Sequence, residues 1–195
     1  MVRAILEGRK TVTRRVVKLP KGSQLEEISW PWMRPTVWLP SRQKSVLMDC
    51  PYGEPGDQLW VRESWCPIYR QGDPDLGVIE VDYRATPTKR MCDLDGSRRW
   101  KPSIHMPRSA SRIQLEITAV RVERLHQISR ESALDEGCSL PDLPSDLAGL
   151  FGECPPDERT AFASLWSRIN GDESWDANPW VWVVEFKVIK GAQHG

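Results

Sequence analysis

The sequence predicts an α+β domain built around an antiparallel or mixed sheet. Residues 10–17, 58–65, 112–125 and 179–190 are rich in β-branched and aromatic residues or alternate between apolar and polar positions, as strands do. Helical patterns separate only some of these segments, so the regular strand–helix alternation of a doubly wound fold is missing. The Gly-rich motifs of Rossmann and P-loop proteins are also absent. At 195 residues the chain fits one domain, and we expect the four segments to form one sheet curled into a barrel.

The longest strand pattern, over residues 112–125, contains a change of register. Ile113 and Ile117 place the apolar face on odd positions, whereas Val120 and Val122 place it on even positions. A slip of one residue inside a strand requires a bulge or a break, which we expect near residues 118–119. A further strand is predicted over residues 78–84.

Three helices are predicted from apolar spacing and from capping residues. They cover residues 1–7, 129–136 and 157–170. Gly8 is suited to end the first helix, and Gly137 is suited to end the second. Ser129 is a favourable N-cap for the second helix.

Residues 19–52 have a different composition from the rest of the chain. This segment contains five Pro residues, together with Trp30, Trp32 and Trp38. Because Pro removes a backbone donor and restricts its neighbours, we expect no regular element there but an ordered insertion that covers the site as a flap. A second loop-rich segment is expected at residues 138–156.

The charge balance argues against a protein that coats nucleic acid. The chain has 27 basic and 27 acidic residues, so its formal net charge is zero. Residues 8–25, however, contain six basic residues and no acid. This local patch is either a solvated strand face or an anion site. The ten Trp residues indicate a thick core or surfaces that stack on flat ligands.

The five Cys residues do not form a zinc motif. None has the two-residue spacing of a zinc knuckle, and their number is odd. We therefore expect reduced thiols in a cytoplasmic protein, with no metal and no cofactor. No apolar run reaches transmembrane length, so no contact with a membrane is expected, and nothing indicates an obligatory protein partner.

Four blocks of the sequence are informative when taken together. They cover residues 5–15, 53–63, 100–108 and 175–182, and the first contains the run Gly8-Arg9-Lys10-Thr11-Val12-Thr13-Arg14-Arg15. Together they resemble ASCH domains of the phage and prophage type, a branch of the PUA-like barrels. The resemblance extends over nearly the whole chain and implies an α+β fold, a mixed or antiparallel β-barrel with short flanking helices. Relatives usually carry a short strand before the helix that here begins at Met1, so we expect an open sheet edge or a missing wall at the site.

The resemblance also implies an activity. The family includes an amidohydrolase that removes the acetyl group from N4-acetylcytidine, and the Gly-Arg-Lys-Thr segment is similar to that enzyme. This likeness implies that Lys10 is the base, Thr13 the nucleophile and Glu136 the proton donor. The residues that we expect to bind substrate or RNA are Thr11, Arg14, Arg15, Arg108 and Arg112.

Amide hydrolysis sets requirements on these residues. It needs a nucleophile, a base and an acid for the leaving amine. Lys10 can act as a base only in its neutral form, and Glu136 can donate a proton only in its neutral form, so the two must be treated as a coupled pair. In a regular strand, positions 10 and 13 face opposite sides. Lys10 and Thr13 can therefore meet only if the segment bends between them.

Other interpretations stay open. The chain could be a non-catalytic module that binds RNA or a modified base, or a ribonuclease, with Arg108 and Arg112 on phosphates and exposed Trp residues on bases. A structural or assembly role in a phage is a third possibility. The expected partner under the first two interpretations is a modified nucleoside or RNA.

Overall fold

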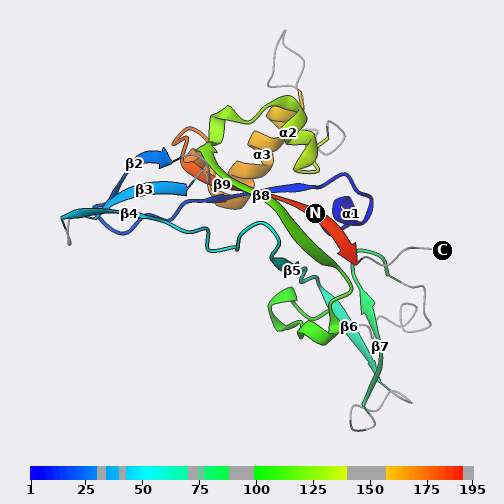
Figure 1. Ribbon diagram of the computed structural model, residues 1–195. Helices are drawn as coiled ribbons and strands as arrows, with labels where there is room; N and C mark the ends of the chain where they lie inside the picture. Colours follow the sequence, from blue (N-terminus) through cyan, green and yellow to red (C-terminus); the bar gives the residue numbers. More distant parts are fainter. Residues whose placement is uncertain are drawn as a thin grey trace.

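A four-stranded antiparallel sheet forms the centre of the computed structural model, which describes residues 1–29, 34–39, 43–69, 75, 77–87, 99–139 and 157–190. Its strands, in spatial order, are β1 (Val12–Val16), β9 (Trp180–Lys190), β8 (Gln114–Arg124) and β5 (Gln58–Trp60). The long strands β8 and β9 curve, so that the sheet is curled as a half-barrel (Figure 1). The prediction that these four segments share one sheet is confirmed in part: each contributes a strand, but only residues 58–60 of the second segment belong to the sheet, which curls as a half-barrel.

The pairing of β8 with β9 contains the predicted bulge. The register shifts between Ile117 and Ala119, which is where the apolar positions in the sequence change from odd to even. On the other side of β9, Val12 pairs with Glu185 and Thr13 with Val184. Because paired residues in an antiparallel sheet point to the same side, this register assigns each side chain of β1 to a face of the sheet.

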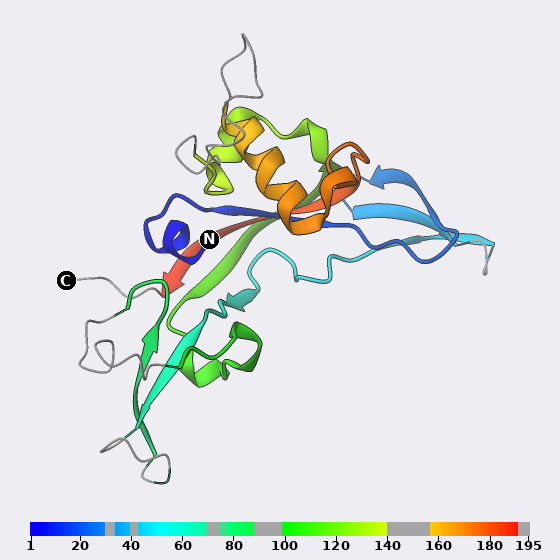
Figure 2. The same ribbon diagram turned by 180° about the vertical axis from the view of Figure 1, so that it is seen from behind.

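Within the described ranges, three α-helices accompany the sheet. They are α1 (Val2–Leu6), α2 (Arg130–Asp135) and α3 (Glu158–Asn170). As predicted, Ser129 caps α2, since its hydroxyl accepts a hydrogen bond from the Ser132 amide at 3.1 Å. Gly8 and Gly137 follow α1 and α2 with φ of 72° and 80°, a left-handed conformation that favours glycine. Helices α2 and α3 lie together on one side of the half-barrel sheet (Figures 1 and 2).

The Pro- and Trp-rich segment forms a second sheet, which corrects the prediction of an irregular insertion. Its antiparallel strands are β2 (Gln24–Ser29), β3 (Arg34–Leu39) and β4 (Lys44–Leu47). Pro35 lies in the middle strand, opposite Ile28. The Pro35 carbonyl accepts from the Met48 amide at 2.9 Å, just after β4 ends. The amide hydrogen that Pro lacks would point to this same side, toward Met48, so the missing donor falls at the end of the β3–β4 ladder rather than inside it.

This three-stranded sheet lies away from the predicted catalytic residues. Leu25 and Met48 pack against Val122 and Trp182, at the end of the half-barrel where β9 begins. Lys10, by contrast, lies just before β1, next to the end of α2. The described part of residues 19–52 therefore does not form a flap over Lys10. Trp30 and Trp32 are outside the described residues.

The segment predicted as one strand over residues 58–65 is divided. Strand β5 ends at Trp60, and the chain leaves the half-barrel sheet before β6 (Trp65–Tyr69) begins. Strand β6 pairs with β7 (Val78–Tyr83), which the sequence predicted, in a separate two-stranded ribbon. In both views this ribbon and the three-stranded sheet project from opposite ends of the molecule (Figures 1 and 2).

The core is divided between the two faces of the half-barrel sheet. Side chains of α2 and α3 pack on Val12, Val181 and Val183 on one face. On the other face, one cluster surrounds Phe186 and another surrounds Trp182.

Some predictions fall on parts of the chain that the structure does not describe. Residues 88–98 and 140–156 are outside the described ranges, and most of the loop-rich segment predicted at residues 138–156 falls there. Cys50, Cys66 and Cys138, which are described, are not part of disulfide bonds. No helix within the described ranges is long and apolar enough to cross a membrane.

Candidate functional site

Lys10 and Glu136 are brought together at the start of β1 by two short helices. The chain turns at Gly8 after α1, and the Lys10 amide donates to the Ala4 carbonyl at 2.9 Å. Lys10 then forms an isolated antiparallel bridge with Glu136, the residue that follows α2. Backbone hydrogen bonds thus fix both residues before their side chains interact.

The side chains of Lys10 and Glu136 form a buried ion pair. Lys10 Nζ lies 2.5 Å from Glu136 Oε2, and the side chains are only 3% and 7% exposed. The same Nζ donates to the Glu136 carbonyl at 2.9 Å and to the Val12 carbonyl at 2.8 Å. Three acceptors match the three hydrogens of an ammonium group. In this arrangement Lys10 is a fully hydrogen-bonded cation.

Arg14 extends this contact into a network of buried charges. Its guanidinium donates to Glu136 at 3.4 Å, to Glu123 at 2.7 Å and to the Ser132 hydroxyl at 2.7 Å. Two cations, Lys10 and Arg14, therefore face two carboxylates. This balance is what a group of buried charges requires.

Thr13 does not share a pocket with Lys10 and Glu136, contrary to the expectation for a catalytic triad. Thr13 pairs with Val184, whereas Arg14, which contacts Glu136, pairs with Val183. The strand alternates regularly here, so Thr13 points to the face that carries Val184. The bend that would bring Thr13 to Lys10 is not present.

The residues expected to bind substrate are distributed over several places. Thr11 lines a polar pocket described below, and Arg15 lines a small pocket beside Lys10. Arg112 is held by Glu63 at 2.9 Å through two nitrogens and lies over the Tyr83 ring, 4.0 Å from its centroid. Arg108 is exposed in the short 3-10 helix Arg108–Ala110. Neither Arg108 nor Arg112 is among the residues that line the pockets around Lys10.

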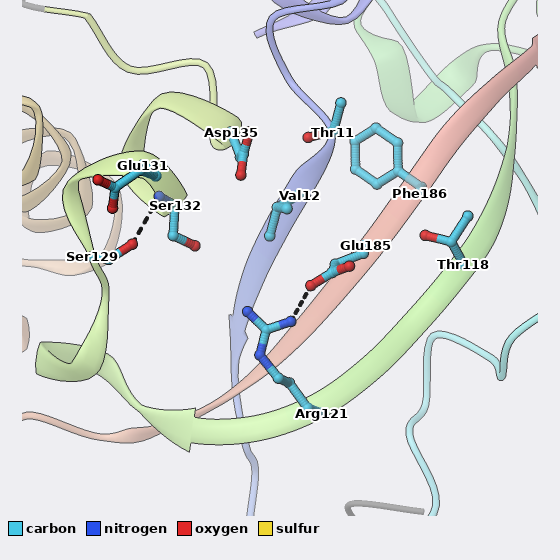
Figure 3. A pocket seen from close by; sticks show the side chains of 10 residues that line it. All are labelled: Thr11, Val12, Thr118, Arg121, Ser129, Glu131, Ser132, Asp135, Glu185 and Phe186. Atoms are coloured by element: carbon cyan, nitrogen blue, oxygen red, sulfur yellow. Dashed lines mark hydrogen bonds and ion pairs between the residues drawn. The ribbon is translucent and has the colours of Figure 1, made fainter.

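A polar pocket of about 340 Å³ lies between α2 and the half-barrel sheet. Thr11, Asp135 and Glu185 are among its walls, and Figure 3 shows the Thr11 and Asp135 side chains on facing sides of the pocket. Arg121 extends from β8 and forms ion pairs with Glu185 and with Glu123. Because Glu123 also holds Arg14, the polar pocket is joined to the Lys10–Glu136 pair through side-chain contacts.

One carboxylate of the polar pocket has a shifted pKa. The backbone N–H of Glu131 itself and the Ser129 hydroxyl hydrogen-bond to the Glu131 carboxylate and hold its pKa below the usual range. Glu131 is thus an anion near neutral pH, and it sits in the first turn of α2, where a negative charge is favoured.

Two further pockets meet at Glu136, on the other side of the ion pair. We call the first the inner pocket, about 60 Å³, whose walls include Lys10, Arg14, Arg15, Glu136 and Trp166. We call the second the basic pocket, about 460 Å³, whose walls include Arg3, Arg9, Glu136, Cys138 and Arg168. Met1, Glu136 and Leu165 belong to both. The ion pair therefore stands where these two spaces adjoin.

Sequence reasoning missed several residues of this site. Arg168 and Trp166 come from α3, and Arg3 comes from α1. Their spacing within each helix indicated only an amphipathic pattern. Only the packing of α1 and α3 around the end of α2 shows that they surround one pocket.

The described residues offer no metal centre, since no group of three or more His, Cys, Asp or Glu side chains among them is arranged to hold an ion. Comparison of the chain with protein-family models, with curated proteins and with solved structures finds no match.

Proposed function

We propose that this domain binds a nucleoside or an RNA base at the Lys10–Glu136 pair, through the basic pocket. One observation carries the proposal: Glu136, a carboxylate held by two cations and 7% exposed, forms part of the wall of both the inner and the basic pocket. A buried ion pair contributes little net stability, because desolvation of the charges offsets their attraction. Buried charges at the wall of a pocket are therefore better explained by recognition of a ligand.

The size and lining of the basic pocket support a ligand of nucleoside size. Its volume, about 460 Å³, falls within the range of small-molecule sites, roughly 300–1,000 Å³. The arginines on its wall present N–H donors, and the carbonyl and ring nitrogen atoms of a base are acceptors. The resemblance of residues 8–15 to ASCH domains points to the same class of ligand, and the curled α+β half-barrel is compatible with it at the level of architecture.

Amide hydrolysis is the second candidate, and the Lys10–Glu136 contact favours it. Hydrolysis by this pair would start from the neutral amine of Lys10 beside the neutral acid of Glu136, a form of the pair with the same total charge as the ion pair. The amine could then take a proton from a water molecule as its oxygen attacks the acyl carbon of an N4-acylcytidine. As the carbon–nitrogen bond breaks, the acid returns a proton to the leaving amine, giving cytidine and a carboxylic acid.

This second candidate departs from the triad expected from the resemblance, because water replaces Thr13 as nucleophile. Thr13 lies on the other face of β1. Lys10 also makes three hydrogen bonds in its charged form, which stabilise the ammonium rather than the free base. Binding is for these reasons the first proposal and hydrolysis the second.

Calorimetry and chromatography with defined nucleosides test both candidates. The purified chain would be titrated with cytidine and with N4-acetylcytidine, and the second mixture would be analysed for free cytidine. We expect Glu136→Gln, which keeps the shape and removes the charge, to weaken binding about tenfold or more. Glu173→Gln is the matched control, since Glu173 is exposed and lies outside these pockets.

The outcomes separate the candidates. Binding without product identifies a binding module, whereas cytidine release that is lost in Lys10→Met identifies a hydrolase. If neither nucleoside binds, or if Glu136→Gln behaves like the control, the proposed function is wrong.

A further inference from the structure

We propose that the basic pocket is an oxyanion subsite, so that the ligand of this domain carries a phosphate group and is a nucleotide or an RNA segment rather than a free nucleoside. This inference rests on the proposed function and makes its ligand more specific. The inference depends on which polar groups around the pocket already have hydrogen-bond partners within the described chain and which do not.

Three arginines from different elements line the basic pocket. Arg3 lies in α1, Arg9 follows the turn after α1, and Arg168 lies in the last turn of α3. Within the described ranges Arg168 has no hydrogen bond or ion pair, and Arg3 uses only Nε, which donates to the Ala85 carbonyl at 2.6 Å. The terminal nitrogens of two guanidinium groups are thus available to a ligand.

The carboxylates in the wall of the basic pocket are already occupied. Glu7 is held by Arg9, with its Oε2 2.6 Å from Nη2 and 2.8 Å from Nε. Glu136 is held by Lys10 and Arg14. Arg3 and Arg168 therefore leave an excess of positive charge in the pocket, and an anion is the complementary ligand.

Trp166 provides an independent indication of a missing acceptor. Its side chain lines the inner pocket and the residue is 5% exposed, yet within the described part of the chain the indole Nε1 has no hydrogen-bond partner. A buried N–H without an acceptor is unfavourable and uncommon in a folded protein. Because the inner pocket adjoins the basic pocket at Glu136 and Leu165, a ligand that spans both could accept this hydrogen.

These donors select the class of ligand. Guanidinium groups have no acceptor atoms, and the indole nitrogen is only a donor. A negatively charged group that offers several acceptor oxygens satisfies them best, and the oxygens of a phosphate monoester or diester fit this description. Planar guanidinium groups also bind phosphate through two parallel hydrogen bonds.

Isothermal titration of the whole chain with cytidine, cytidine 5′-monophosphate and inorganic phosphate tests the inference. We expect the monophosphate to bind about tenfold to a hundredfold more tightly than cytidine, as charge-assisted hydrogen bonds allow. Arg168→Gln and Arg3→Gln should lower the affinity for the monophosphate much more than the affinity for cytidine, and so remove this preference. Arg159→Gln is the matched control, because it removes the same charge from the same helix outside the pocket.

Trp166→Phe provides a second readout that a purely structural role would not give. The variant keeps an aromatic ring in the core, but it removes the N–H together with part of the bicyclic indole. Affinity for the monophosphate should fall by up to about tenfold, and the midpoint of urea unfolding of the free protein should fall moderately, because the smaller ring leaves a cavity in the core. A large drop in the unfolding midpoint with unchanged affinity would overturn the role given to Trp166.

The titrations also distinguish failure of the inference from failure of the proposed function. Equal affinity for cytidine and its monophosphate overturns the oxyanion subsite and leaves nucleoside binding intact. Binding of inorganic phosphate alone, sensitive to Arg168→Gln, supports the subsite and overturns the nucleoside proposal. Absence of binding by all three compounds overturns both.

Discussion

The two faces of the half-barrel sheet differ in what they bury. The face covered by α2 and α3 carries buried or nearly buried charged groups, among them Lys10, Arg14 and Glu123. The opposite face carries apolar side chains such as Trp182 and Phe186. Apolar groups need only to be removed from water, and any neighbour of suitable shape suffices. Charged groups each need a specific partner at hydrogen-bonding distance. The helix-covered face is thus more demanding to build, and the inner pocket, with Lys10, Arg14 and Glu136 in its wall, is on that face.

The largest losses in the free energy of unfolding are expected from substitutions of buried residues, one set on each face of the sheet. Glu136→Leu leaves the buried cations Lys10 and Arg14 without their shared carboxylate, and we expect a loss of about 3–5 kcal/mol in the free energy of unfolding. The double variant Lys10→Met with Glu136→Leu should recover most of this loss, because it removes both charges and fills the space with apolar atoms. On the other face, Trp182→Ala should cost about 3–5 kcal/mol through the cavity it leaves. Urea unfolding measures all three.

Recovery in the double variant is the decisive comparison. A double variant that is as unstable as Glu136→Leu would show that the cost comes from lost packing rather than from an unpaired charge. The two faces would then be stabilised in the same way, and the argument that the ion pair serves a ligand would lose its basis.

A smaller effect is expected from two glycines that flank the ion pair. Gly8 and Gly137 both have positive φ, but a Cβ at Gly8 meets nothing within 4 Å, whereas at Gly137 it would lie 2.9 Å from Ala4 Cβ and 3.1 Å from Lys10 Cβ. Gly8→Ala should cost about 1–2 kcal/mol, for the left-handed backbone alone. Gly137→Ala should cost about 1–3 kcal/mol more and should also weaken ligand binding, because it displaces Lys10. Thermal or urea unfolding of the two variants, side by side, measures the difference; equal losses would contradict the close packing of α1 against α2.

The smallest effect concerns the N-cap of α3, which lies over the charged face. The amide of Thr160 donates to the Asp157 carboxylate at 2.8 Å, and this hydrogen bond holds the pKa of Asp157 below its ordinary value. A lowered pKa means that the stabilisation is present above the unfolded pKa, about 3.9, and is lost as the pH falls through the folded pKa.

Asp157→Ala should therefore lower stability by about 1 kcal/mol near neutral pH, and this difference should shrink below about pH 4. Thermal unfolding of both proteins between pH 7 and pH 2.5 measures it. Asp157→Asn is the control, since it keeps a capping oxygen that does not titrate. A difference between wild type and Asp157→Ala that is independent of pH would show that the carboxylate charge does not contribute.

Local patterns in the sequence were enough to predict most of the central architecture. The alternation over residues 179–190 predicted β9, and the change of parity between Ile117 and Val120 predicted the bulge in β8. Ser129 and Gly137 predicted the ends of α2. Each of these features depends on neighbouring residues, so sequence spacing is informative.

The same local reasoning was wrong where distant partners decide. Proline density predicted no regular element at residues 19–52, yet Pro35 fits β3 because β4 has ended where its amide hydrogen would be needed. The continuous pattern over residues 58–65 predicted one strand, but the chain leaves the sheet after Trp60, and Trp65 begins a ribbon with β7. Pairing partners far along the chain determined both outcomes.

In the candidate site, too, some features follow from local sequence and others from distant contacts. The sequence by itself determined that Lys10, Thr13 and Arg14 belong to a strand region in which neighbouring side chains alternate, and that Glu136 ends a short helix, because backbone geometry follows local residue types. Only the tertiary structure decided that Lys10 and Arg14 share Glu136, that Thr13 faces the other side, and that Arg168 completes the basic pocket. Buried charges must find partners wherever the fold brings them, and contacts between residues more than a hundred positions apart are set by how helices pack on a sheet rather than by spacing along the chain.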